Sequence, residues 1–157
     1  MPTLILRQLR KRNNLLHSQA VWVIMDPWTM QPRHDYEKYP NINLSNKIYA
    51  DRIIEYLPYV ANWIVSCESN IGITPEFEYL PRVAHGNDLG LYIQASGLKR
   101  IVYVGFHWGR CILGRDDGAK RMSETYKCYA KQNLCGSYPD DNQDLMTKYS
   151  KPYLTCF

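Results

Sequence analysis

The chain contains 157 residues, of which 45% are hydrophobic and 22% are charged. This length suits one domain with a single core, since ordinary domains contain ~100–200 residues, and the apolar content excludes a wholly disordered protein. The net charge is +4, and the basic residues between positions 7 and 12 carry all of this excess. A solvated terminal segment is more common than a phosphate-binding one, so the charge does not favour nucleic acid as a partner. We expect a basic N-terminal segment, residues 1–19, followed by a single α/β domain, residues 20–157.

The sequence also bears on cellular location. No stretch approaches the ~18 uninterrupted apolar residues of a membrane-spanning helix, and Arg7 interrupts the N-terminal apolar run before a signal-type core develops. The five cysteines are odd in number, widely spaced and without a C-x-x-C pair, which argues against a disulfide framework and a zinc site. Free thiols are typical of a reducing compartment. We therefore expect a cytoplasmic protein that contacts no membrane.

Two short strands and a helix are predicted in the first half of the chain. Residues 20–25 (AVWVIM) form a nearly continuous apolar run, which is typical of a strand covered on both faces of a parallel sheet. After a polar loop, apolar residues at helical spacing predict a helix over residues 43–57, which Pro58 ends. Residues 62–67 (NWIVSC) indicate a second strand. The next stretch, 68–87, is interrupted by glycines and prolines and has no clear assignment.

The second half alternates helices and strands. Residues 88–97 predict a helix with a capping aspartate at its start and a glycine at its end, and residues 101–105 (IVYVG) predict a strand. Residues 110–125 predict an exposed crossover helix, residues 126–131 a further strand, and residues 140–149 a short helix. This order predicts an α/β fold, a three-layer α/β/α sandwich with a mainly parallel, Rossmann-like sheet.

The candidate site lies where two predicted strands end, because ligands bind outside the carboxyl ends of parallel strands. Asp26 directly follows the first strand, and Cys111 follows the strand that ends at Gly105 after a short connection. Cys111 lies near the start of the next predicted helix, whose free N–H groups favour thiolate over thiol. A carboxylate beside such a cysteine can act as its base, so Asp26 and Cys111 are candidate catalytic residues.

These motifs resemble those of the isochorismatase-like cysteine hydrolases, a family that includes nicotinamidases. The resemblance covers residues 20–134 and rests on VIMD at the end of the first strand, on SGLKRIVYVG with the G-x-x-x-x-x-C spacing that ends at Cys111, and on TYKCYAKQNLC. It implies that Asp26 is the base, that Cys111 is the nucleophile, and that a lysine from the middle of the chain completes the triad. It also implies an oligomer, and a cis peptide bond near His107 whose N–H helps to bind an oxyanion.

The third catalytic position differs from the family pattern. The chain has no lysine between Lys47 and Lys99, and the best match to the family's hydrophobic-x-Lys pattern is Val83-Ala84-His85. His85 is therefore the predicted third catalytic residue, with Arg82 as the second choice. The paired histidines of a nicotinamidase metal site are also missing, so we expect no metal ion and no other cofactor.

Further residues near the two strand ends are candidates for contact with the substrate. The predicted oxyanion- or substrate-binding residues are His107, Trp108, Arg82 and Trp28. Each candidate also has a structural alternative. Cys111 can be a small core residue, Asp26 can stabilise a turn, and the aromatic side chains can cover the core edge or an oligomer contact.

The sequence leads to two hypotheses for function. In the first, the protein is a hydrolase whose cysteine attacks a small amide or related carbonyl compound and forms an acyl-enzyme intermediate, while backbone N–H groups near His107 and Cys111 hold the oxyanion. In the second, the missing lysine marks a catalytically impaired pseudoenzyme that acts as a binding or scaffold protein. The first hypothesis requires a small-molecule substrate. The resemblance and the exposed aromatic loops also predict a homo-oligomer.

Overall fold

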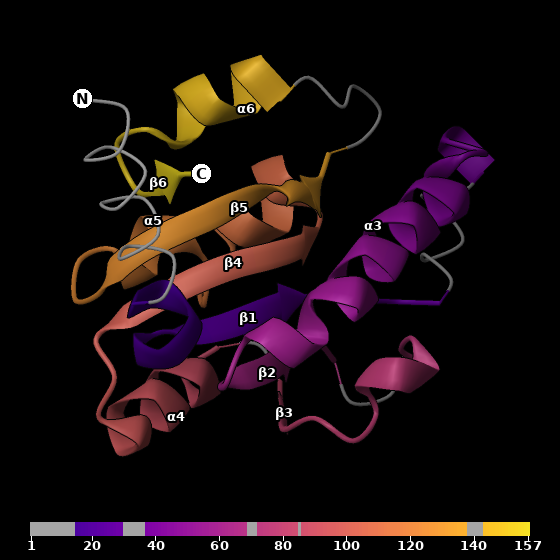
Figure 1. Ribbon diagram of the computed structural model, residues 1–157. Coiled ribbons are helices and arrows are strands. Elements are labelled where there is room, and N and C mark those ends of the chain that lie inside the picture. Colours follow the sequence, from indigo (N-terminus) through magenta and orange to yellow (C-terminus); the bar gives the residue numbers. More distant parts are fainter. Residues whose placement is uncertain (1–14, 30–36, 69–71, 85, 138–142) are drawn as a thin grey trace, which may run out of the picture.

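A single six-stranded sheet forms the centre of the molecule (Figure 1). The strand order is β3-β2-β1-β4-β5-β6, and every neighbouring pair is parallel. Helices pack against both faces, so the predicted three-layer α/β/α sandwich is confirmed. The computed structural model describes residues 15–29, 37–68, 72–84, 86–137 and 143–157.

The sheet has four inner strands and a two-residue strand at each edge. All five residues of β1 are fully buried, because this strand lies at the centre of the sheet and is covered on both faces. The strands are β1 (Val21–Met25), β2 (Trp63–Ser66), β3 (Arg82–Val83), β4 (Arg100–Phe106), β5 (Lys127–Gly136) and β6 (Thr155–Cys156).

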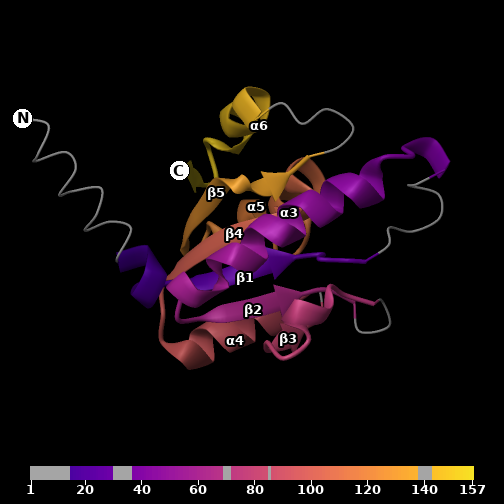
Figure 2. The ribbon, with the colours of Figure 1, turned by 45° about the vertical axis from the view of Figure 1, so that its right-hand side comes forward.

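The two faces of the sheet pack against different helices, as Figure 2 illustrates. Trp22 and Ile24 of β1 point to the face that α3 covers, whereas Val21, Val23 and Met25 point to the face that α4 and α5 cover. The core is therefore divided into two apolar layers by the sheet. The helices are α3 (Ile42–Tyr56), α4 (Asp88–Ser96), α5 (Ala119–Met122) and α6 (Gln143–Ser150), with 3-10 turns η1 (Leu57–Tyr59) and η2 (Pro75–Phe77).

Most elements lie where the sequence predicts them. The strands β1, β2 and β4 agree with the predicted strands to within one residue at each end. The helix α3 begins and ends one residue earlier than predicted. Helix α4 ends as predicted at Gly97, which has φ +73°, a left-handed conformation that glycine adopts without steric cost.

The predicted crossover helix over residues 110–125 is wrong as a single helix. The structure has a π-helical turn, η3 (Trp108–Ile112), and then the short helix α5, with a break between them. At Gly118 the chain is extended, and a Cβ there would lie 2.7 Å from the carbonyl oxygen of Ile112. Asp117 beside it is fully buried. The backbone at this point therefore turns inward instead of continuing as an exposed helix.

The two least predictable regions are the segment after β2 and the C-terminus. The segment over residues 68–87 contains η2 and the short edge strand β3, and the C-terminus adds the edge strand β6. The predicted strand over residues 126–131 is longer in the structure, where β5 extends to Gly136. No helix in the part of the chain that the structure describes is long and apolar enough to cross a membrane.

The structure describes the basic N-terminal segment only from residue 15 onward, so the basic residues at positions 7–12 lie outside the described residues. Residues 15–19 are helical. Leu16 is 1% exposed, and its carbonyl oxygen accepts a 2.8 Å hydrogen bond from the indole of Trp22. The end of this segment thus packs against the core.

Candidate active site

The site forms where the chain leaves the central strands β1 and β4. Strand β1 pairs in parallel with β2 on one side and with β4 on the other. The connections after β1 and β4 therefore leave the sheet together, at the carboxyl ends of the strands. Met25 at the end of β1 faces Gly105 on β4. Gly105 has φ +106°, and a Cβ there would collide with the backbone of Met25. This glycine allows the two strand ends to approach closely.

Asp26 is the first residue after β1, and its side chain is 1% exposed. Its backbone N–H donates to the Ser66 carbonyl at 3.0 Å, and its carbonyl accepts a 2.8 Å bond from the N–H of Trp28. Its φ is +46°, a left-handed value that aspartate tolerates better than most residues. These contacts turn the chain sharply at Asp26 and bury its carboxylate.

Cys111 lies in η3, directly after β4, and its side chain is half-buried. The peptide bond between Phe106 and His107 at the start of this connection is cis, as the resemblance implied. The carbonyl of His107 accepts the N–H groups of both Cys111, at 2.8 Å, and Ile112, at 3.1 Å. The Cys111 N–H is therefore occupied within the turn.

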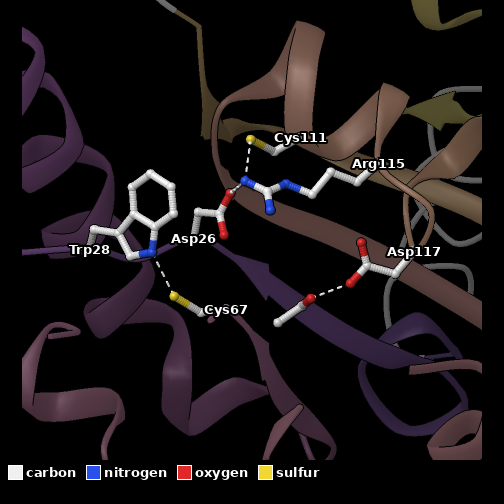
Figure 3. A network of polar contacts seen from close by, with 7 residues as sticks. Asp26, Trp28, Cys67, Cys111, Arg115 and Asp117 are labelled. Atoms are coloured by element: carbon white, nitrogen blue, oxygen red, sulfur yellow. Dashed lines mark hydrogen bonds and ion pairs between the residues drawn. The ribbon is translucent and has the colours of Figure 1, made fainter. Parts of the chain in front are cut away.

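Arg115 joins the two candidate catalytic residues (Figure 3). Its Nη2 donates to Asp26 Oδ2 at 2.5 Å and to Cys111 Sγ at 3.3 Å. The other N–H groups of its guanidinium have no acceptor among the described residues. One cation thus holds a buried carboxylate and a thiol at the same point.

The charges at this point act on the thiol in opposite directions. Burial raises the pKa of Cys111 to about 12, and the charge of Asp26 together with a hydrogen bond to its carboxylate contributes to the increase. The positive charge of Arg115 and its hydrogen bond lower the pKa of the same thiol. Burial lowers the pKa of Arg115, but the acidic groups of Cys111 and Asp26 outweigh this effect, so that the net shift is upward. Cys111 is therefore a protonated thiol at neutral pH, and its sulfur accepts a hydrogen bond from Arg115.

These three side chains open into a cavity of about 280 Å³. The cavity combines charged groups with apolar and aromatic walls, as is usual for a small-molecule site. Its lining residues are Asp26, Trp28, Tyr39, Ile42, Phe106, His107, Arg110, Cys111, Gly114 and Arg115.

Two predicted substrate-binding residues, Trp28 and His107, line this cavity, and a third, Trp108, does not. The Trp108 side chain is fully buried in the core, where its indole N–H donates to Ser150 Oγ on α6 at 2.8 Å. Trp28 is fixed at two points, since its indole N–H donates to Cys67 Sγ at 2.7 Å and its carbonyl accepts a 2.7 Å bond from Asn46.

The two residues predicted for the third catalytic position lie differently. His85 is outside the described residues. Arg82 is at the start of β3, where its guanidinium donates to the Glu68 carbonyl and lies close enough to Cys67 to lower the pKa of that thiol. Arg82 is not among the lining residues of the cavity. Arg115, and not Arg82, forms the ion pair with Asp26 that the structure shows.

Sequence reasoning missed Arg115 and the residues that support it. Arg115 follows Cys111 by four positions, a spacing that places side chains on one side of a helix, and this signal was present. Asp117 is fully buried and accepts a hydrogen bond from the Ser66 hydroxyl at the end of β2. Its backbone carbonyl accepts a 2.8 Å bond from the hydroxyl of Tyr103 on β4. The loop that carries Arg115 is therefore tied to two strands.

The described residues contain no group of three or more His, Cys, Asp or Glu side chains arranged to hold a metal ion. All five cysteines are free thiols. The chemistry that these side chains offer is thus that of a thiol, a carboxylate and a guanidinium.

Comparison with known proteins identifies the fold through structure and not through sequence. No family model matches the chain. No curated protein matches it either. Solved structures match with high probability, although the sequence identities are low.

Three of these structures illustrate the likeness. An isochorismatase-like hydrolase from Alkaliphilus metalliredigens is 11% identical with a TM-score of 0.65, and the match covers 89% of this chain and 93% of that one. A nicotinamidase from Staphylococcus aureus is 12% identical with a TM-score of 0.60, over 85% and 95%. The YcaC gene product from Escherichia coli, an octameric hydrolase of unknown specificity, is 14% identical with a TM-score of 0.54, over 92% and 76%. The chain therefore has the fold of the isochorismatase-like hydrolases.

Proposed function

We propose that the protein is a cysteine-dependent hydrolase of a small amide or related carbonyl compound, acting through an acyl-enzyme intermediate. One observation carries this proposal: at the wall of the cavity, Nη2 of Arg115 donates hydrogen bonds to both Asp26 and Cys111. A nucleophile, a base and a fixed positive charge are the groups that acyl transfer needs. The fold of isochorismatase-like hydrolases and a nicotinamidase supports the same reaction class.

In the first half of the reaction, Asp26 takes the proton of the Cys111 thiol as the sulfur attacks the carbonyl carbon. The carbonyl π electrons move to oxygen and form a tetrahedral intermediate. When this intermediate collapses, the carbon–nitrogen bond breaks and Asp26 gives the proton to the leaving nitrogen. Ammonia or an amine departs, and the acyl group remains on the sulfur as a thioester.

In the second half, water replaces the leaving group in the cavity. Asp26 removes a proton from the water as its oxygen attacks the thioester carbon. The carbon–sulfur bond then breaks, the sulfur takes the proton back from Asp26, and the carboxylic acid leaves. The net reaction consumes one amide and one water and releases one acid and one amine, with the protein unchanged.

Arg115 is the electrostatic group of this mechanism. Its guanidinium stays charged, pairs with the Asp26 side chain, and lowers the pKa of Cys111 against the effect of burial. Its remaining N–H groups are suited to donate to the oxygen that becomes negative in the tetrahedral intermediate. Such a donor is worth ~3 kcal/mol of transition-state stabilisation. Arg115 thus serves where the resemblance places a lysine.

The oxyanion donors differ in one respect from those that the sequence predicted. Backbone N–H groups near His107 and Cys111 were expected to hold the oxyanion, but the Cys111 N–H donates to the His107 carbonyl at 2.8 Å. This N–H is not available to a substrate. We therefore assign the principal oxyanion contact to Arg115.

The walls of the cavity favour a small, flat substrate. Trp28 and Phe106 both line it, and the charged centre of Arg115 lies 6.0 Å from the Trp28 ring. Aromatic walls of this kind pack against planar groups such as a conjugated amide. His107 lines the same cavity and offers a polar contact to the substrate.

A panel of small amides tests the proposal by mass spectrometry. We expect one or more amides to give turnover, or a covalent adduct on the Cys111 peptide whose mass equals the acyl group. Both signals disappear in Cys111→Ala and remain in Cys67→Ala, the matched control at the other thiol near Asp26. Binding of amides without any adduct or turnover would support the pseudoenzyme hypothesis and contradict the enzyme.

We propose a homo-oligomer, because the YcaC gene product of this fold is an octamer and because α3 carries exposed apolar residues, Leu44 and Ile48. Light scattering checks this, and a monomer at high concentration contradicts it. The five free thiols support a reducing, cytoplasmic location.

A further inference from the structure

We infer that the substrate carries a carboxylate, which Arg110 binds at the mouth of the cavity. This inference rests on the proposed function, since it concerns the substrate of the same site. Arg110 lines the cavity that contains Cys111 and directly precedes it in η3. Its side chain is exposed, so it lies where a substrate enters.

The described residues that line the cavity carry one more positive than negative charge. Its charged lining residues are Asp26, Arg110 and Arg115. Asp26 and Arg115 form an ion pair at 2.5 Å and compensate each other. The Arg110 guanidinium has no ion pair or hydrogen bond with any residue that the structure describes. Among the residues that the structure describes, the lining of the cavity thus has one positive charge without a counter-charge.

The chemistry of Arg110 selects a planar anion. A guanidinium offers parallel N–H groups that match the two oxygens of a carboxylate. Arg110 and Cys111 are consecutive residues, so their Cα atoms are about 3.8 Å apart. A substrate held by both side chains must be short. A small molecule with an amide near the sulfur and a carboxylate a few bonds away fits this arrangement.

Alkylation of Cys111 measures this anion subsite without knowledge of the substrate. Iodoacetate and iodoacetamide transfer similar groups to a thiol, but only iodoacetate carries a carboxylate. The measured quantity is the ratio of the two labelling rates at Cys111, followed by peptide mass spectrometry and divided by the ratio for N-acetylcysteine. We expect this normalised ratio to exceed 1, the value of a thiol without an anion subsite, because Arg110 lines the same cavity as Cys111.

Substitution of Arg110 assigns the effect to its charge. We expect Arg110→Gln to lower the normalised ratio about fivefold, the effect of one partly exposed charge contact, and Arg110→Lys to lower it less. Arg121→Gln is the matched control, because Arg121 is an exposed arginine on α5 outside the cavity. An unchanged ratio in Arg110→Gln, with thermal unfolding like that of the parent protein, overturns the inference.

Paired substrates then separate this inference from the proposed function. Succinamate and 4-oxopentanamide differ in that a methyl group replaces one carboxylate oxygen, as do 4-carbamoylbenzoate and 4-acetylbenzamide. We expect Cys111-dependent hydrolysis to be faster for the carboxylate of each pair, and this preference to fall in Arg110→Gln. Equal rates within the pairs contradict the carboxylate and leave the hydrolase in place. A labelling ratio that depends on Arg110, together with no turnover of any amide, contradicts the hydrolase and leaves the anion subsite.

Discussion

Two thiols lie near Asp26, and each has an arginine beside it. On one side of Asp26, here called the β3 flank, Cys67 follows β2 and lies near Arg82 of β3. On the other side, the η3 flank, Cys111 lies in η3 and contacts Arg115. The charge of Asp26 raises the pKa of both thiols. The two flanks thus contain the same chemical groups in different surroundings.

The difference between the flanks is access and not acidity. Burial raises the pKa of Cys67 to about 11 and that of Cys111 to about 12, with Asp26 as the second cause for both. Cys67 is fully buried and accepts the indole N–H of Trp28, whereas Cys111 lines the cavity. A thiol that a carbonyl carbon cannot reach has no use for a base. The comparison teaches that the cavity, together with a cation bonded to Asp26, distinguishes a candidate nucleophile from a core cysteine.

Removing each sulfur gives the largest contrast between the two flanks. We expect Cys111→Ala to lower kcat/KM by ~10³-fold or more, since the nucleophile is lost. Cys67→Ala keeps the charges of the cavity and the Asn46 bond to Trp28 but removes the acceptor of the Trp28 indole, so we expect kcat/KM within about threefold of the parent value. Steady-state kinetics on a hydrolysed amide measures both. Comparable losses in the two variants would show that access to the cavity does not decide the role.

Removing each arginine is the next contrast. We expect Arg115→Gln to lower kcat by ~10²-fold, because it removes the positive charge from Asp26, Cys111 and the developing oxyanion. Arg115→Lys keeps a charge and restores part of this loss. Arg82→Gln removes a donor to the Glu68 carbonyl, and we expect it to lower stability more than kcat. A loss of kcat in Arg82→Gln larger than in Arg115→Gln would move the catalytic cation to the β3 flank, where the sequence predicted it.

The rate of Cys111 alkylation tests the opposite effects that Arg115 and Asp26 have on the pKa of this thiol. Arg115 lowers the pKa of Cys111 and Asp26 raises it. Below the pKa, labelling follows the thiolate fraction, so Arg115→Gln slows labelling at a given pH and Asp26→Asn accelerates it. Each change is about three- to tenfold per unit of pKa, since a more basic thiolate is also more nucleophilic.

Hydrolysis provides the control for this experiment. Asp26→Asn should label faster with iodoacetamide at pH 8 and yet lose turnover, because the base is missing. Parent protein should show labelling that still increases at pH 10, as a pKa of about 12 requires. A plateau near neutral pH would mean that Cys111 is already a thiolate, and Asp26 would not be its base.

The η3 flank, where β1 and β4 end, could be predicted from sequence because its signals are local. The apolar runs of these strands end at Met25 and Phe106, and Asp26 and Cys111 follow within a few residues. Parallel strands place such residues at one edge of the sheet, so no contact between distant segments had to be known. The fold class followed from the same alternation of strands and helices.

The remaining features of the site depend on contacts between distant segments. Asp26 and Arg115 are separated by 89 positions, and the pairing follows from the break before α5, which the predicted continuous helix did not contain. Strand β3 has two residues, too few for a periodic pattern to reveal. The family pattern directed attention to His85 and Arg82 on that side. Arg115, four residues after the candidate nucleophile, could be found only by considering the spacing of Cys111 and Arg115.

The smallest expected effect compares two neighbours at the end of β2 that support different flanks. The Ser66 hydroxyl donates to the buried Asp117, which anchors the loop of Arg115, whereas Cys67 accepts from Trp28. We expect Ser66→Ala to cost ~1–3 kcal/mol of unfolding free energy, because it leaves a buried carboxylate with one donor fewer. It should also lower kcat several-fold while KM changes little, since Arg115 is displaced from Asp26 and the cavity walls remain. Cys67→Ala serves as the matched variant one residue away, with a comparable loss of stability and an unchanged kcat. Chemical denaturation and steady-state kinetics measure the two quantities, and a fall of kcat in proportion to stability in both variants would mean that Ser66 acts on the fold alone.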